Sequence, residues 1–116
     1  MSNDVKKIVE NLKLQNTSFR EVGGNKDNLL INGDSSKVLT VFPDESVDVI
    51  FTDPPYNAHL KYGITYKDNL PWDKYYIQAK EWFAEYHRIL KKTGSVYIMN
   101  YPEINARLLP YFIDEL

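Results

Sequence analysis

The apolar positions of the chain switch between helical and strand-like spacing. Near the N-terminus they recur at i, i+3, i+4 and i+7, which predicts an amphipathic helix over roughly residues 3–14. The polar stretch 15–28 that follows contains two adjacent glycines and predicts a connector. Residues 29–31 are apolar and lead into NGDSS, so we expect a strand, a glycine turn and a short helix capped by Asp34 or Ser35.

Residues 46–52, SVDVIFT, are apolar at both alternations once Asp48 is passed. This pattern is typical of a strand that is covered on both faces, as in a parallel sheet. The polar connection 58–70 that follows is longer than most connections in compact domains, which predicts a functional or mobile segment.

A helical stripe of apolar and aromatic residues then covers residues 72–90, and Lys91, Lys92 and Gly94 suit its end. The sequence SVYIMN, residues 95–100, predicts another strand. A last helix opens at Pro102. We expect its apolar face to consist of Ile104, Leu108, Leu109 and Phe112.

Three strand–helix units in succession predict an α/β fold, with helices on both faces of one sheet. In such sheets, ligands bind at the carboxyl ends of the strands. Asp34, Asp53 and Asn100 all fall at predicted strand ends. These positions are therefore the first candidates for a functional site.

Composition excludes several classes of function. The 14 basic and 16 acidic residues give a formal net charge of -2, so the chain lacks the overall positive charge of a free-standing nucleic-acid binder. Without cysteine there are no disulfides, thiolate metal sites or cysteine nucleophiles. His59 and His87 lack the clustered acidic or histidine neighbours of a metal site, so we expect no metal.

No segment of the sequence resembles a targeting or membrane-spanning element. The N-terminal residues alternate acids and bases, unlike a signal peptide. No apolar run approaches the ~20 residues that a membrane span requires. We therefore expect a soluble, cytoplasmic protein with no membrane partner.

The segment DPPYN, residues 53–57, combines hydrogen-bond acceptors with an aromatic ring. A Pro-Pro pair presents carbonyl oxygens but no N–H donors, and an ionised Asp53 adds only acceptors. The natural complement is a planar group with an exposed amine, such as that of adenine or cytosine. Two acceptors can bind its hydrogens and direct its lone pair towards an electrophile. A base inside a duplex must flip out to reach such a pocket, where Tyr56 could stack on it.

A simpler interpretation is that Asp-Pro marks a turn and that Tyr56 only packs. The context favours the functional interpretation, because the segment follows an apolar strand at the carboxyl end of a predicted parallel sheet.

Gly33 to Asn57, GDSSKVLTVFPDESVDVIFTDPPYN, closely resembles the N-terminal part of the β group of DNA amino-methyltransferases. The stretch NKDNLLINGDS is also similar to the modification subunits of type III restriction-modification systems. The resemblance extends over residues 25–100. It implies methylation of an exocyclic amine, and the leading Asp of the motif favours adenine N6 over cytosine N4.

The resemblance also implies roles for individual residues. Asp53 and the Pro54 carbonyl would hold the amine, Pro55 would shape the turn, and Tyr56 would stack on the flipped base. The cofactor would be S-adenosyl-L-methionine, with Asp34 near its adenosyl part and Asp53 near its methionine end. Candidate DNA contacts are Asn57, His59, Lys61 and Lys67.

The resemblance further implies a Rossmann-like sheet that is incomplete here. Residues 1–27 would form an N-terminal helix and connector, and residues 28–116 a partial methyltransferase catalytic domain. The F-x-G-x-G loop that cradles the cofactor is absent from the sequence, as is a region that reads DNA. The strand at 29–31 would then have no ladder partner, and the strand before DPPYN would have an exposed edge.

We therefore expect a truncated or split enzyme, inactive alone, that needs a complementary polypeptide carrying the glycine-rich loop and the recognition region. Three alternatives stay open. The chain could derive from a cytosine-N4 methyltransferase, it could be a non-catalytic module that docks on a partner subunit, or it could be an unrelated α/β domain with a chance motif.

Overall fold

The computed structural model describes residues 2–60, 63 and 67–116. None of the helices in these residues is long and apolar enough to span a membrane. In chain order, the elements are α1 (Asn3–Leu14), β1 (Ser18–Val22), β2 (Asn25–Asn32), α2 (Ser35–Val38), the 3-10 turn η1 (Leu39–Val41), β3 (Val47–Thr52), α3 (Trp72–Ile89), β4 (Leu90–Ile98) and α4 (Pro102–Asp114).

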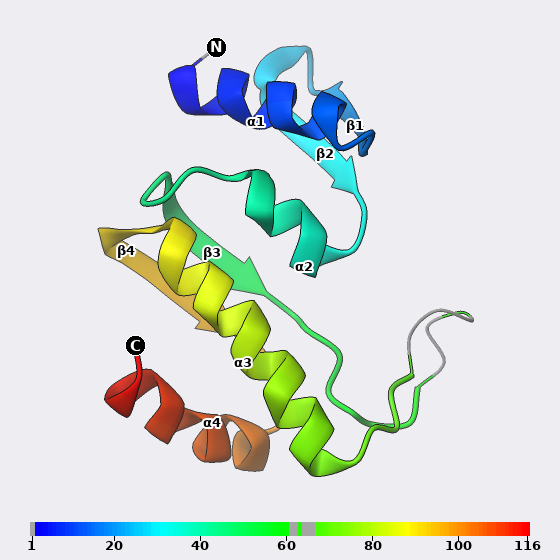
Figure 1. Ribbon diagram of the computed structural model, residues 1–116, viewed down its shortest axis with the longest axis vertical. Coiled ribbons are helices and arrows are strands. Elements are labelled where there is room, and N and C mark those ends of the chain that lie inside the picture. Colours follow the sequence, from blue (N-terminus) through cyan, green and yellow to red (C-terminus); the bar gives the residue numbers. More distant parts are fainter. Residues whose placement is uncertain (1, 61–62, 64–66) are drawn as a thin grey trace.

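The described strands form two separate two-stranded sheets (Figure 1). β1 and β2 are antiparallel, with Arg20 opposite Leu30. β3 and β4 are parallel, with Ile50 opposite Val96. The α/β class and the parallel pairing are thus as the sequence predicts. The single sheet of three strand–helix units is not formed by the described residues.

The first sheet corrects two expectations. Residues 15–28 are not a connector, because they contain β1 and the start of β2, joined by a tight turn at Gly23 and Gly24. Both glycines have φ near +66°, a conformation that other residues rarely adopt. The strand expected at 29–31 also has a ladder partner, because these residues of β2 pair with residues 19–21 of β1. The boundary proposed between residues 27 and 28 falls inside β2.

The hairpin packs on the N-terminal helix. α1 is capped by the Ser2 hydroxyl, which accepts a hydrogen bond from the Val5 N–H. Ile8 and Leu12 of α1 are buried together with Val41 of η1. Their spacing in the sequence is the helical period that predicted this element.

The second sheet carries the larger hydrophobic core on one face. Ile50 of β3 and Val96 and Ile98 of β4 pack against a buried cluster from α3 and α4. The stripe of α3 is as the sequence predicts, and its buried members are Tyr75, Ala79, Trp82, Phe83, Tyr86 and Ile89. α4 contributes Ile104 and Leu108. Leu109 was expected on the same apolar face, but its side chain is 53% exposed, so this expectation is wrong.

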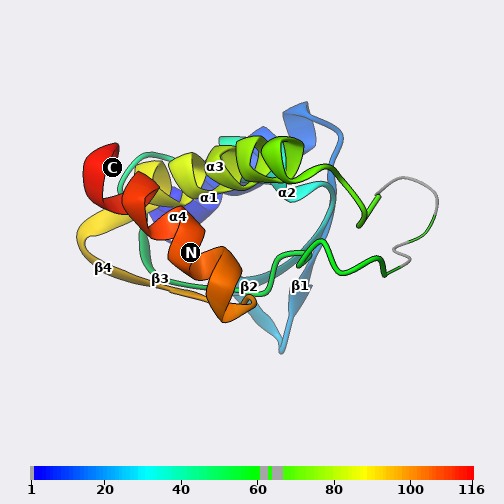
Figure 2. The same cartoon turned by 90° about the horizontal axis from the view of Figure 1, so that it is seen from below.

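The opposite face of this sheet is uncovered. Val49, Phe51 and Tyr97 are 59%, 71% and 58% exposed, and α3 runs along the other side of the strands (Figure 2). The expectation of a strand covered on both faces is therefore wrong for this chain. The predicted free edge is confirmed for the described residues, since β3 pairs only with β4.

The boundary between α3 and β4 differs from the expected one. α3 ends at Ile89, and Leu90 is already extended, so the segment expected to end the helix opens the strand. Leu90 pairs with Val47, and the register shifts before Val49 meets Ser95. A Cβ on Gly94 would lie 2.8 Å from the Asp48 carbonyl oxygen, so glycine permits the close approach of the two strands at this bulge.

Polar contacts from α3 join the two cores. The Arg88 guanidinium donates hydrogen bonds to the carbonyls of Leu39 and Phe42, at 3.0 and 2.9 Å. The Trp82 indole N–H donates to the Ser36 hydroxyl at 3.2 Å. The segment from α2 to η1 is therefore attached to α3 at both of its ends.

We expect Phe83→Ala to lower the free energy of unfolding by about 3–5 kcal/mol, because Phe83 is 1% exposed at the centre of the larger cluster. Chemical denaturation monitored by circular dichroism measures this change. Ile77→Ala is a matched control on the same helix, because Ile77 is 60% exposed. Equal losses in the two variants would contradict the assignment of this core.

Candidate amine-binding site

The segment 53–57 begins where the pairing of β3 ends. The Met99 N–H donates to the Thr52 carbonyl at 2.9 Å, and the chain then leaves the sheet without regular structure. Asp53 is exposed, Pro54 is buried and Tyr56 is half-buried. The candidate site thus lies at the carboxyl end of a parallel strand, where the sequence predicts it.

The buried hydroxyl group of Tyr75, on α3, binds the backbone of this segment. The Tyr75 hydroxyl donates to the Pro55 carbonyl at 2.7 Å and accepts from the Asn100 amide at 2.9 Å. Burial raises the pKa of Tyr75, and the hydrogen bond from Asn100 offsets only part of this effect. Tyr75 therefore stays protonated at neutral pH and remains a donor to Pro55.

The two prolines differ in what their carbonyls contact. Tyr75 binds the Pro55 carbonyl, whereas no donor among the described residues binds the Pro54 carbonyl. The pair therefore leaves an acceptor available beside Asp53.

Asp53 and Tyr56 contact each other directly. The Tyr56 hydroxyl donates to Oδ1 of Asp53. The Tyr56 ring packs against the ring of Tyr101, with centroids 5.3 Å apart and planes tilted by 59°. The structure thus brings the predicted carboxylate and the predicted stacking ring together, and it adds a second aromatic ring from the start of α4.

The four candidate DNA contacts have different environments. Asn57 is only 7% exposed, and its amide both donates to the Leu70 carbonyl and accepts from the Leu70 N–H, each at 2.8 Å. His59 and Lys67 are exposed on the connection that follows the motif. Lys61 lies outside the described residues.

No hydrogen bond or ion pair joins the Asp34 side chain to residues 53–57 in the part of the chain that the structure describes. Its carboxylate caps α2 by accepting from the Ser36 N–H at 2.9 Å, as the sequence predicts. Its side chain is exposed beyond that contact.

Sequence reasoning missed the residues that hold the motif from outside. Asp68 is 2% exposed and its carboxylate accepts three backbone N–H groups. Tyr75 belongs to the apolar stripe of α3, so its position in the sequence gave no sign of a polar role. One signal for Asp68 was available in the sequence. Asp68 lies just before Asn69 and Pro71 at the start of a helix, where an Asp often forms hydrogen bonds with backbone N–H groups of a turn.

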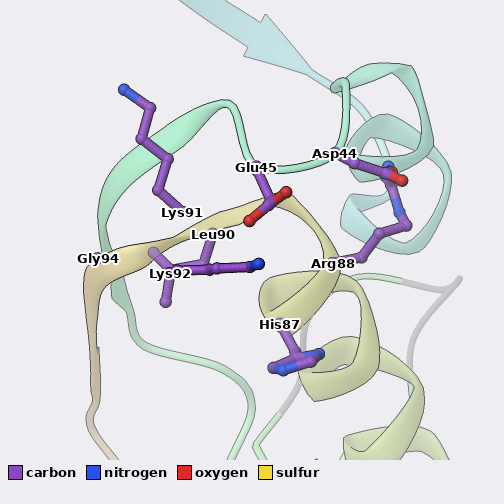
Figure 3. Close-up of a pocket in the computed structure, with 8 residues that line it drawn as sticks. All are labelled: Asp44, Glu45, His87, Arg88, Leu90, Lys91, Lys92 and Gly94. Atoms are coloured by element: carbon purple, nitrogen blue, oxygen red, sulfur yellow. The ribbon is translucent and has the colours of Figure 1, made fainter.

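A cavity of about 430 Å³ shares no residue with this site. It lies at the other end of the sheet, between residues 44–45, the end of α3 and the start of β4 (Figure 3). Three of its charged residues form ion pairs: Arg88 lies 2.7 Å from Asp44, and Lys91 lies 2.9 Å from Asp48. No group of three potential metal ligands occurs among residues 2–60, 63 and 67–116.

Comparison with known proteins decides the family. Residues 47–114, more than half of the chain, match the family model described as DNA methylase. The chain belongs to the DNA methylase family. This family covers both the N6 and the N4 classes of DNA methylase. The match also removes the interpretation of the chain as an unrelated domain with a chance motif.

Several curated relatives are similar to the chain. Type II methyltransferase M.HpaI of Haemophilus parainfluenzae is 43% identical over 62% of the chain. Type II methyltransferase M.BamHI of Bacillus amyloliquefaciens is 41% identical over 75% of it. DNA adenine methyltransferase YhdJ of Escherichia coli is 45% identical over 69% of it. The chain spans only 23%, 21% and 27% of the lengths of these relatives.

The raised pKa of Tyr75 predicts how stability depends on pH. An unfolded tyrosine has a pKa of 10.0, so the unfolded chain releases this proton before the folded protein does. The contribution is fully present below pH 10 and is lost as the pH rises towards the folded-state pKa. We expect the free energy of unfolding of Tyr75→Phe to fall less steeply above pH 10 than that of the wild type.

Chemical denaturation at a series of pH values measures the slope. Burial also raises the pKa of Tyr86, so adding Tyr86→Phe should flatten the decline further. At pH 7, Tyr75→Phe should cost about 1–3 kcal/mol, because the Pro55 carbonyl loses its donor. Parallel pH profiles in the wild type and both variants would contradict the prediction.

Proposed function

We propose that this chain supplies the amine-binding part of an enzyme that methylates the N6 amine of adenine in DNA. The main support for this proposal is a pair of hydrogen-bond acceptors next to the aromatic ring of Tyr56. Oδ2 of Asp53 and the Pro54 carbonyl have no donor among the described residues, while Oδ1 of Asp53 holds the Tyr56 hydroxyl. Such a pair matches the two hydrogens of an exocyclic amine.

The arrangement can activate an amine by orientation and electrostatics. The lone pair of an aromatic amine is delocalised into the ring, and two acceptors on its hydrogens direct that pair out of the plane. The carboxylate of Asp53 also stabilises the positive charge that develops on nitrogen as a new bond forms. Pro55 fixes the turn, and Tyr56 offers a face for a base that has left the duplex.

The choice of adenine rests on the leading Asp of the motif. One relative at 45% identity is named a DNA adenine methyltransferase, which agrees with this choice. Cytosine N4 is the alternative, since the family includes both classes. Type II methyltransferases among the relatives support a role in restriction-modification.

S-adenosyl-L-methionine would supply the methyl group as an electrophile. The described residues do not by themselves form a site for it. Gly33 packs against Val38 and Gly94 against Leu90, so neither glycine is available to line a cofactor cradle. Asp34 and Asp53 are the two residues that we propose to contact the cofactor, with the remaining contacts supplied from outside this chain.

A complementary polypeptide would therefore complete the enzyme. The uncovered face and the free edge of the β3–β4 sheet support this proposal, because both lie on the strand that leads into Asp53. Joined to strands of that partner, β3 and β4 would belong to a larger Rossmann-like sheet. The partner would carry the glycine-rich loop and the region that recognises DNA sequence.

DNA would approach the exposed part of the connection after the motif. His59 and Lys67 are exposed there, and we propose them and Lys61 as backbone contacts. Asn57 is retained as a weaker candidate, since its amide faces Leu70.

The central test is reconstitution of methyl transfer. The chain is mixed with a polypeptide that carries the glycine-rich loop and recognition region, and transfer of a radioactive methyl group to DNA is measured. We expect activity only in the mixture, and a loss of at least ~10²-fold in Asp53→Ala, which removes the electrostatic term. Asp48→Ala is the matched control, because Asp48 lies on the same strand and pairs with Lys91 on the surface.

A fully active Asp53→Ala mixture would refute the catalytic assignment. Partner binding that is indifferent to Asp53 and Tyr56, without any methylation, would instead support a non-catalytic docking module. Hydrolysis of the labelled DNA separates N6-methyladenine from N4-methylcytosine and so decides between the two substrates.

The uncovered sheet face makes a separate prediction. Phe51→Thr should weaken association with the complementary polypeptide by about tenfold, because a contact of this size contributes at least ~1.5 kcal/mol when buried. The fold of the isolated chain should not change, since Phe51 is 71% exposed. Titration by fluorescence anisotropy measures the affinity. Ile113→Thr is a control of equal exposure, 71%, on α4, and an equal loss there would contradict the proposed interface.

A further inference from the structure

A buried carboxylate holds the backbone that follows the amine-binding motif. Oδ1 of Asp68 accepts from the Asn57 N–H at 2.9 Å. Oδ2 accepts from the N–H groups of Ala58 and Leu60, each also at 2.9 Å. Three donors from one short segment thus converge on one side chain that is 2% exposed.

Further hydrogen bonds join the two ends of the same connection. The His59 N–H donates to the Asp68 carbonyl at 2.7 Å. The Asn57 amide and the Leu70 backbone exchange a pair of hydrogen bonds. We call this set of contacts between residues 57–60 and residues 68–70 the clasp.

The backbone within the clasp requires such support. Asn57 and His59 have φ values of +59° and +62°, in the left-handed region that residues with a Cβ seldom occupy. Conformations of this kind persist only where the surrounding structure over-determines them. Asp68 contacts no lysine or arginine among the described residues, so backbone N–H groups stabilise its buried charge.

We propose that Asp68 is a positioning residue for the amine-binding site, an assignment that rests on the proposed function. Asn57 directly follows Tyr56, so the peptide that Asp68 binds sets where the Tyr56 ring lies. Tyr75 fixes the preceding carbonyl, at Pro55. The two contacts hold the backbone on both sides of Tyr56, and Asp68 acts on the substrate only through that backbone.

Asp68→Asn is a sharp test, because an amide offers one acceptor atom where a carboxylate offers two. If its oxygen faces Asn57, its NH2 faces the donors of Ala58 and Leu60. If the amide is reversed, the Asn57 N–H loses its acceptor. Either orientation leaves at least one buried N–H without a partner, with little change in side-chain volume.

The first measurement uses the isolated chain and needs no activity. Hydrogen exchange by NMR should accelerate by about tenfold or more at Asn57, Ala58 or Leu60 in Asp68→Asn, because these amides lose their acceptors. Amides within α3, such as that of Phe83, should exchange as in the wild type. Asp73→Asn is the matched control, since Asp73 is exposed on the first turn of α3.

The second measurement uses the reconstituted complex. Asp68→Asn should lower kcat by about 10²-fold through misplacement of the Tyr56 segment, with the KM for DNA unchanged. Asp73→Asn should leave both unchanged.

The outcomes separate the two proposals. Unchanged exchange at all three amides would overturn the clasp, and accelerated exchange with unchanged kcat would overturn the positioning role. A wild-type complex that transfers no methyl group would overturn the proposed function, and the positioning role of Asp68 with it. The exchange result would still decide whether Asp68 holds this backbone.

Discussion

The described structure depends on the buried face of α3. Its apolar side chains fill the larger core against β3, β4 and α4, and its polar atoms reach the remaining parts of the chain. At the N-terminal end, Tyr75 supports the Pro55 carbonyl. In the middle, Trp82 holds the start of α2 through Ser36, and at the C-terminal end Arg88 binds the carbonyls of Leu39 and Phe42. One helix therefore sets both the core and the place of the candidate site.

The motif itself explains why it needs support from outside. Two consecutive prolines remove two backbone donors, so the segment cannot be held by the ladder that orders β3. Its carbonyls and the N–H groups that follow must find partners elsewhere. Tyr75 supplies the donor and Asp68 supplies the acceptors. The segment is thus held without the Pro54 carbonyl, which binds no donor among the described residues.

The uncovered face of β3 and β4 lies within residues 47–114, the part of the chain that matches the DNA methylase family. The strand is apolar on both alternations, yet only the side of Ile50 is packed, and Phe51 and Tyr97 face outward with centroids 6.4 Å apart. A sequence that encodes burial on two faces supports the proposed partner, whose contact would remove this exposed apolar surface from water.

The sequence alone determined the helices at both ends, the stripe of α3 and the parallel strand that leads to Asp53, because each follows from local periodicity or from residue type. The chemistry of the motif stays a prediction from residue type. The sequence could not reveal the β1–β2 pairing, since β1 and the start of β2 are mostly polar and show no clear strand alternation. Nor could it reveal the clasp, in which Asp68 meets residues 57–60 across an intervening connection. Asn57 shows the difference most clearly: its place on the motif suggested a DNA contact, whereas in the structure its φ is +59° and its amide donates to the Leu70 carbonyl. Such pairings depend on which distant backbone groups lack partners, and only the tertiary structure decides that.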